Sequence, residues 1–396
     1  MADTDAPTTA AASAPPRATR RRVVFGLVLF AITTLLFAAP WAALFAPSAQ
    51  WPTPVVVVGT AVFAVGYLAF PVLLVRSLGR RHSDRAARVA LPLLGVVWIA
   101  FAWTLVTHVL RLVLAVAGVE NPFRARLVAV LLAVVVVGLA AYGHHVAMRV
   151  PPVRRADVVL PRLDPAFDGL TIAVLADTHY GPIDRTRWSQ GLVAAVNELR
   201  ADVVVHVGDI ADGTVEQRRG QSTPLGGVEA AHRFYVSGNH EYLSNAQAWM
   251  DHMDELGWTS LHNRHRVLER GGARLVFAGT DDITAAHSGE HGHAADLDAA
   301  LAGVRPEDPV VLLAHQPSEI RKAAAAGVDL QLSGHTHGGQ IWPFHLLVRL
   351  QQPVVQGLSA HGGRTQLWTS RGAGFWGPPF RVFAPNEISL LTLRSR

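Results

Sequence analysis

Four long apolar runs follow one another in the first 150 residues, and they limit what this chain can fold into. They cover about 23–45, 54–75, 89–109 and 127–148. Each is close to the roughly 20 residues that a helix needs to cross a bilayer. Half of the chain is hydrophobic and only 16% is charged, which is typical of proteins with membrane segments. The sequence therefore predicts four transmembrane helices.

The first run has two other interpretations. Its basic flank and the small residues near Ala38 also fit a cleaved signal peptide. A buried core helix of a soluble protein is the second alternative. Three more apolar runs follow, and this succession favours a membrane anchor with several spans over both.

Arginine side chains flank the apolar runs unevenly. Four arginines precede the first run and five lie between the second and third, whereas the loop 46–52 has no charge. Because positively charged loops stay on the cytoplasmic side, this predicts a multi-pass protein of the cell membrane with its C-terminal domain in the cytoplasm. The net charge of +5 then reflects topology, and no nucleic-acid partner is expected. The chain has no cysteine, which excludes disulfides and thiolate metal sites.

The pattern changes after the fourth run and predicts a second domain. Residues 1–18 are expected to form a disordered tail, 19–150 the four helices, 151–165 a linker that begins with two prolines, and 166–396 an α/β domain. Short apolar strands are predicted at 170–176, 203–207, 234–236, 275–278, 310–313 and 330–332, and a helix at 186–200. This alternation indicates an α/β fold with functional groups on the loops that follow the strands.

Polar side chains with metal-binding chemistry follow most of the predicted strands. They are Asp177 and His179, Asp209 and Asp212, Asn239 and His240, His315, and His335 with His337. Divalent Mn, Fe and Zn accept both oxygen and imidazole ligands. Two such ions about 3.5–4 Å apart can hold the attacking and leaving oxygens of a phosphoryl displacement. Asp209 is central in the series and follows a glycine, so it is the best candidate to bridge two ions.

The order of these residues resembles that of the calcineurin-like metallophosphoesterase superfamily. The series D-x-H, GD-x-x-D, GNH[DE], H and GH-x-H is present between Asp177 and His337. The longer form GHTHGGQ at 334–340, with 370–374 and 385–388, is similar to the bacterial branch of membrane-associated phosphodiesterases. Some relatives in that branch hydrolyse the pyrophosphate of UDP-2,3-diacylglucosamine. The resemblance covers about 165–396 and implies two packed β-sheets flanked by helices, with metals at the strand ends.

The resemblance also implies a role for each matching residue. Two divalent metal ions (Mn, Fe or Zn) would be bound by overlapping sets, namely Asp177, His179, Asp209 and His337 for the first and Asp209, Asn239, His315 and His335 for the second. His240 would contact the phosphate and protonate the leaving group, and Asp212 would orient a ligand without binding metal. Glu241 stands where many members have aspartate. The implied reaction is attack of a metal-bridging hydroxide on a phosphodiester or pyrophosphate.

Apolar residues directly after the last metal motif bear on the substrate. Trp342, Phe344 and Leu347 are expected either to pack in the core or to form a lip that contacts acyl chains or the bilayer. An amphiphilic or lipid-linked phosphate ester is therefore the expected substrate, with a soluble nucleotide as the alternative. A separate glycine-rich loop carries His287, His291 and His293, for which solvated side chains are expected rather than a metal site.

Two other classes of function fit the same sequence. One is a non-catalytic membrane scaffold or sensor with a phosphoesterase fold. The presence of every expected ligand argues against that class. The other is a transporter or receptor whose C-terminal domain is regulatory, and the absence of paired acidic residues from the middle of the spans argues against it.

Overall fold

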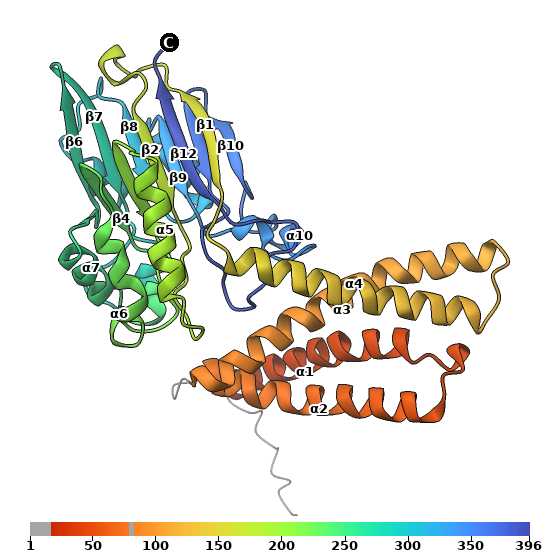
Figure 1. Cartoon of the computed structure of the whole chain (residues 1–396). Coiled ribbons are helices and arrows are strands. Elements are labelled where there is room, and N and C mark those ends of the chain that lie inside the picture. Colours follow the sequence, from red (N-terminus) through yellow and green to blue (C-terminus); the bar gives the residue numbers. More distant parts are fainter. Residues whose placement is uncertain (1–16, 79–82) are drawn as a thin grey trace, which may run out of the picture. The chain divides into compact units, whose positions relative to one another are not determined.

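The computed structural model describes residues 17–78 and 83–396 of the chain (Figure 1). The predicted tail, 1–18, lies outside the described residues except for its last two positions, which begin the first helix. By its internal contacts the chain divides into two units. One contains residues 1–69 and 104–132, and the other contains 70–103 and 133–396.

Four long helices precede the α/β domain, as predicted. Each is long and apolar enough to cross a membrane, which indicates a membrane protein. The helices extend beyond the apolar runs, because the backbone hydrogen bonds of a helix continue through polar flanking residues. Their bounds are α1 (Arg17–Leu44), α2 (Thr53–Leu78), α3 (Asp84–Val116) and α4 (Phe123–Met148).

Within the first unit, aromatic and polar side chains join the helices. The Phe37 and Tyr67 rings meet edge to face, with their centroids 5.9 Å apart. The short helix η1 (Pro47–Ala49) follows α1. Near the start of α4, Arg126 donates hydrogen bonds of 2.8 and 2.7 Å to the carbonyls of Ala49 and Gln50. These bonds satisfy backbone groups at a turn that would otherwise lack partners.

Two six-stranded sheets form the α/β part of the second unit. The first sheet has the order β1-β12-β2-β3-β4-β5 and the second has the order β10-β11-β9-β8-β7-β6. In chain order the strands are β1 (Val153–Val159), β2 (Thr171–Leu175), β3 (Val203–Val207), β4 (His232–Val236), β5 (Thr259–Ser260), β6 (Arg264–Arg270), β7 (Ala273–Gly279), β8 (Val310–Leu313), β9 (Leu330–Ser333), β10 (Gly357–His361), β11 (Thr365–Thr369) and β12 (Ile388–Arg394).

The two sheets enclose a common hydrophobic core. Phe234 of β4 and Phe277 of β7 meet there, with ring centroids 5.2 Å apart, and Trp368 of β11 and Leu391 of β12 belong to the same cluster. Strands β2 to β5 are parallel, and so are β7, β8, β9 and β11. Parallel strands buried on both faces are expected as continuous apolar runs, which is how they stand in the sequence.

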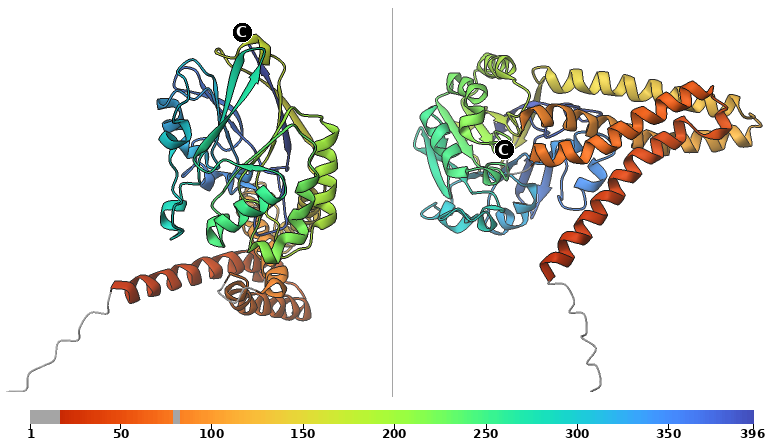
Figure 2. Two further views of the ribbon diagram at one scale, coloured as in Figure 1. Left: turned by 90° about the vertical axis from the view of Figure 1, so that its left-hand side faces the viewer. Right: turned by 90° about the horizontal axis from the view of Figure 1, so that it is seen from below.

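Helices cover the outer face of each sheet, so that the fold class predicted from the sequence is confirmed (Figure 2). On the first sheet lie α5 (Thr186–Glu198), α6 (Val215–Ser222) and α7 (Ala246–Glu255); the second carries α8 (Leu297–Leu301) and α9 (Ile320–Ala325). The remaining helices are α10 (His345–Val348), η2 (Pro165–Phe167), η3 (Thr223–Gly227), η4 (Glu241–Leu243), η5 (Ala285–His287), η6 (Pro317–Glu319) and η7 (His337–Gly339).

The segment predicted as a linker, 151–165, departs from the sequence-based expectation. It contains β1, which pairs in parallel with β12 along its whole length, from Val153 opposite Ile388 to Val159 opposite Arg394. The partner strand lies more than 200 residues later in the chain, so no local pattern could reveal the pairing. The domain therefore begins at the end of α4, and little free linker separates them.

The predicted membrane region, 19–150, is not a unit by itself. Residues 70–103 and 133–148 belong by their contacts to the second unit. Ile99 of α3 is buried in a cluster with Ile341, Phe380 and Val382, and Leu139 of α4 packs against the same cluster. Parts of two membrane helices thus share a hydrophobic core with the loops that follow η7.

Candidate metal centre

Loops that follow the parallel strands bring the predicted site residues together. Asp177 and His179 follow β2, Asp209 and Asp212 follow β3, and Asn239 and His240 follow β4; His315 follows β8, and His335 and His337 follow β9. Because these strands are parallel, their carboxyl ends lie at one edge of each sheet. Every residue predicted as a ligand is therefore at the same edge of the sandwich.

The backbone at this edge is strained. Ten non-glycine residues of the described chain have positive φ, and five of them are predicted ligands, namely Asp177 (53°), His179 (42°), Asp209 (56°), His335 (68°) and His337 (51°). Such conformations cost free energy and concentrate at functional sites. Glycines in the motifs allow the close approach. A Cβ atom at Gly238 would collide with the Asp209 carboxylate, and one at Gly334 would collide with that of Asp177.

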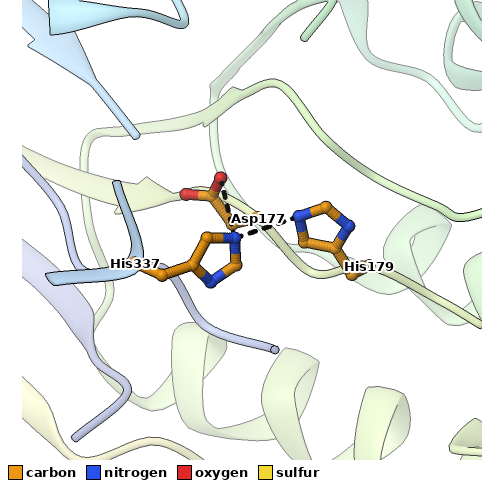
Figure 3. A group of neighbouring side chains, drawn as sticks. All are labelled: Asp177, His179 and His337. Carbon is orange, nitrogen blue, oxygen red and sulfur yellow. Dashed lines mark hydrogen bonds and ion pairs between the residues drawn. The ribbon is translucent and has the colours of Figure 1, made fainter. Parts of the chain in front are cut away.

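One group of donor atoms consists of Asp177, His179 and His337 (Figure 3). The Nε2 atom of His337 lies 3.6 Å from Oδ1 of Asp177 and 3.1 Å from Nε2 of His179. All three side chains are buried. The donor atoms lie within 4.8 Å of one another, which is close enough for them to share one cation.

A second group consists of Asp209, His315 and His335, with Asn239 beside them. The Nε2 atom of His315 lies 3.2 Å from Oδ2 of Asp209. The Nδ1 atom of His335 lies 2.9 Å from Oδ1 of Asn239. The same Oδ2 atom of Asp209 is also 3.5 Å from Nε2 of His179, a member of the first group. Asp209 is thus the carboxylate that faces both groups.

The hydrogen bonds of His315 show that a cation fits here. Its Nδ1 atom donates to the carbonyl of Val207 at 2.7 Å, so Nε2 is the nitrogen that is left for a proton or a metal ion. Nε2 is buried 3.2 Å from Oδ2 of Asp209, and although burial opposes the charged ring, the carboxylates of Asp209 and Asp177 raise the pKa of His315 well above its usual range, so a positive charge is favoured at this point. A metal ion in place of the proton would supply the same positive charge. The donor set of carboxylate, amide and imidazole suits Mn, Fe or Zn.

The protonation of the other imidazoles also fits metal binding, which requires neutral rings. Burial lowers the pKa of His335 to about 3. Burial, with the guanidinium of Arg381, holds the pKa of His337 well below its usual range. Both rings are therefore neutral and available as ligands.

Asp212 and His240 lie beside the two groups. Oδ1 of Asp212 accepts hydrogen bonds from Nδ1 of His179 at 2.9 Å and from Nδ1 of His240 at 2.8 Å. Burial opposes the charged form of His240, but the carboxylates of Asp209 and Asp212 outweigh it and raise the pKa to about 9. The ring of His240 is partly open to solvent. One carboxylate thus fixes both a predicted ligand and the predicted acid.

Glu241 has a larger structural role than its place in the motif suggested. Its buried carboxylate accepts hydrogen bonds from the backbone amides of Asp209 (3.0 Å), Ile210 (2.5 Å) and Gly238 (2.6 Å). These three amides belong to the loops after β3 and β4. Glu241 therefore ties together the two loops that present Asp209 and Asn239.

Comparisons with known proteins agree with this geometry. A family model described as calcineurin-like phosphoesterase matches residues 170–339. An uncharacterized metallophosphoesterase of Campylobacter jejuni is 31% identical over 85% of this chain and 89% of its own length. The chain belongs to the metallophosphoesterase family.

For two further relatives, the alignment with this chain covers a smaller share of the relative's length. A transmembrane protein with metallophosphoesterase domain from Danio rerio is 34% identical over 70% of this chain and 64% of that protein. An uncharacterized metallophosphoesterase of Helicobacter pylori is 37% identical over 63% of this chain and 66% of that protein. The chain thus spans just under two thirds of these two relatives. The family resemblance is confirmed, whereas the branch that acts on UDP-2,3-diacylglucosamine stays an expectation.

Two buried arginines of the metallophosphoesterase site were not predicted. Arg381 donates from Nη1 to the carbonyl of His337 at 2.7 Å and from Nε to that of Gly374 at 3.0 Å. Arg185 donates from Nη2 to the carbonyls of Thr178, at 2.5 Å, and of His179. Both hold the backbone that carries ligands. Neither stands in a motif, and a single arginine in a loop gives no signal that its guanidinium is buried.

The residues predicted as a lip have partners on α3. The ring of Trp342 lies 5.7 Å from that of Trp103, and the ring of Phe344 lies 5.8 Å from that of Trp98. Leu347 is about half exposed. Contact of these residues with a substrate stays a prediction. Trp376, which the sequence analysis did not single out, is half exposed and its ring lies 5.9 Å from that of His240.

Proposed function

We propose that this metallophosphoesterase is a membrane-anchored, metal-dependent hydrolase of a phosphodiester or pyrophosphate bond. The observation that carries the proposal is the position of Asp209, whose Oδ2 atom faces Nε2 of His179 at 3.5 Å and Nε2 of His315 at 3.2 Å. A carboxylate shared by two donor groups is what a two-metal phosphoesterase needs.

The donor atoms divide between two divalent cations, manganese, iron or zinc. The first would be held by Asp177, His179, Asp209 and His337, and the second by Asp209, Asn239, His315 and His335. When bound, the ions supply Lewis-acid chemistry, which stabilises charge on the phosphoryl oxygens and makes water a better nucleophile at neutral pH.

The protein's own acid is His240. Asp212 accepts from its Nδ1 atom, so that the ring is held in one orientation and Nε2 remains for the substrate. A proton on Nε2 can pass to the leaving oxygen as the bond to phosphorus breaks. His240 is not needed as a ligand, because both donor groups are complete without it.

An amphiphilic substrate is supported by the proximity of the site to membrane helices within the second unit. The backbone amide of Arg381 donates to the carbonyl of Gly143 in α4 at 2.9 Å, and the same residue's Nη1 atom donates to the carbonyl of His337. In α3, Nε of Arg88 donates to the carbonyl of Pro182 at 2.8 Å, three residues after His179. The reaction would then take place near the polar headgroups of the bilayer.

Trp376 provides a partly exposed apolar surface beside His240. A half-exposed indole beside the reacting group can pack against an acyl chain, and indoles are favoured at membrane–water interfaces. We therefore propose a lipid-linked phosphodiester or pyrophosphate as the substrate. A soluble nucleotide is the alternative, because a dimetal centre recognises only the phosphate.

The arginine distribution supports a catalytic domain in the cytoplasm of a cell whose plasma membrane contains the four helices. Alkaline phosphatase fused to the C-terminus should be inactive and a fluorescent protein should be bright. High alkaline phosphatase activity would place the domain on the opposite side.

The hydrolase proposal is tested with full-length protein in lipid nanodiscs. Asp209→Asn should abolish hydrolysis of bis(p-nitrophenyl) phosphate and lower the bound manganese, whereas the exposed control Asp298→Asn should retain both. Wild-type turnover in Asp209→Asn would contradict the assignment of Asp209 to the metal centre. No turnover in the wild type would contradict the hydrolase and favour a scaffold or sensor.

The lipid preference is tested on the same preparation. A lipid-linked pyrophosphate and a soluble dinucleotide are compared as substrates of the wild type and of Trp376→Ala. The variant should lose activity on the lipid only, with Leu358→Ala on β10 as an exposed apolar control. Equal loss on both substrates, or hydrolysis of the nucleotide alone, would refute the lipid proposal without affecting the metal centre. Point variants are preferred to removal of the helices, because truncation at 166 would remove β1 from its sheet.

A further inference from the structure

A second group of imidazole and carboxylate side chains lies apart from the proposed dimetal centre. His262 stands in the turn between β5 and β6, Asp281 follows β7, and His293 lies in the glycine-rich loop before α8. The sequence analysis expected this loop to be solvated. That is correct for His287 and His291, which are exposed, but wrong for His293, which is 7% exposed.

The three side chains converge on one point. Nδ1 of His262 lies 2.6 Å from Oδ1 of Asp281, and Nδ1 of His293 lies 3.7 Å from Oδ2 of the same carboxylate. The two imidazole rings have centroids 4.6 Å apart. Ligand atoms around a tetrahedral zinc ion, bound at about 2.0–2.1 Å, lie about 3.3 Å from one another. The observed separations lie on either side of that value, so small side-chain movements suffice to hold an ion.

Hydrogen bonds of Gln247 determine which ring nitrogen of His293 carries the lone pair. Gln247 donates from Nε2 to Asp251 at 2.7 Å, which makes its Oε1 atom the acceptor for Nε2 of His293 at 3.1 Å. The ring proton is therefore on Nε2, and the lone pair is on Nδ1, which lies 3.7 Å from Oδ2 of Asp281. The hydroxyl of Tyr242 accepts from Ser237 at 3.2 Å and donates to this Nδ1 atom at 3.1 Å, and it would turn its proton away when an ion takes the lone pair. Metal-binding histidines are oriented by hydrogen bonds of this kind.

The local charge balance favours a cation. Asp281 and Asp282 are adjacent and almost completely buried. Within the described residues, Asp281 has ion pairs only with the two histidines, and neither carboxylate has one with lysine or arginine. Buried carboxylates are stabilised by a positive partner or by several hydrogen bonds. Asp282 accepts hydrogen bonds from Thr284 and Gln316, so Asp281 is the carboxylate that faces the two imidazoles and would bind the ion.

We propose that His262, Asp281 and His293 bind one zinc ion that is separate from the two ions of the dimetal centre. Two imidazoles and one carboxylate form a donor set that zinc favours. The ion would join the β5–β6 turn, the end of β7 and the 288–296 loop. Because Tyr242 lies in η4, directly after His240 and Glu241, the ion would also steady the loop that carries the proposed acid.

The test is the zinc content of full-length protein after incubation with zinc and desalting, measured by inductively coupled plasma mass spectrometry. Wild type should retain one more ion per chain than His262→Ala/His293→Ala. The same difference of one ion should appear when both proteins also carry Asp209→Asn, which disrupts the dimetal centre. His291→Ala, an exposed histidine of the same loop, is the matched control and should retain the wild-type content.

Equal zinc content with and without His262 and His293, in folded protein, would overturn the proposal. Failure of the dimetal centre alone would change the total but not the difference of one ion, so the two proposals fail separately. If the double variant does not fold, the single variant His262→Gln replaces it, because this side chain is one-third exposed. With cobalt in place of zinc and both proteins carrying Asp209→Asn, the protein with native His262 should show a visible absorption band that His262→Gln loses. An unchanged band would likewise refute the site.

Discussion

Asp212 is the residue whose replacement should separate metal binding from acid catalysis. Its Oδ1 atom accepts from Nδ1 of His179 at 2.9 Å and from Nδ1 of His240 at 2.8 Å, so that one carboxylate orients a proposed ligand and the proposed acid. Asp212→Asn keeps the size of the side chain and an acceptor oxygen but removes the negative charge. Asp212→Asn therefore weakens the hydrogen bonds to His179 and His240 without leaving a cavity.

The expected effect follows from the strength of these bonds. A hydrogen bond to a charged group contributes about 1.5–3 kcal/mol and a neutral one about 0.5–1.5 kcal/mol, a difference of about 1 kcal/mol for each ring. A loss of 1 kcal/mol is about fivefold in a rate or a binding constant. We expect kcat at saturating manganese to fall about fivefold because of His240. The manganese concentration for half-maximal rate should rise about fivefold because of His179.

The assay is hydrolysis of bis(p-nitrophenyl) phosphate by full-length protein over a range of manganese concentrations. Asp298→Asn, an exposed aspartate on α8, is the control for loss of one negative charge and should match the wild type. If Asp212→Asn leaves both constants unchanged, the carboxylate does not orient either ring during turnover. If only the manganese dependence changes, its contact with His240 has no catalytic role.

The remaining predictions concern the acid and the core. His240→Ala should retain the wild-type metal content while turnover falls about 10²–10⁴-fold, as expected for loss of a general acid; loss of bound metal would instead identify His240 as a ligand. Phe277 is fully buried between the sheets. Phe277→Ala should therefore lower the free energy of unfolding of the domain, measured with denaturant, by about 3–5 kcal/mol. A loss below about 1 kcal/mol would mean that the two sheets do not depend on this contact.

Several parts of the fold could be predicted because their signal is local. The four membrane helices are long apolar runs, and the central strands are short apolar runs buried on both faces. The ligand-bearing loops were found for a related reason, since each stands directly after such a strand. A motif of this kind combines residue type, spacing and position at a strand end, and all three can be seen in the sequence.

Other features depend on contacts between distant segments. The predicted linker contains β1, and the pattern could not show this because β12, the strand with which it pairs, lies more than 200 residues away. Arg381 is buried against the carbonyl of His337 although the sequence places it in an unremarkable loop rich in proline and phenylalanine. His293 is buried against Asp281 although glycine-rich polar loops are usually solvated.

The sequence by itself determined which residues carry the chemistry and that a membrane anchor precedes them, because residue type and hydrophobic periodicity are properties of short segments. Only the tertiary structure decided which donor atoms face one another, which imidazole nitrogen carries a lone pair, and that Asp209 lies between both groups. Those properties depend on distances and hydrogen bonds between strands from two sheets. The packing of the sandwich sets these distances, and no single segment of the chain contains that information.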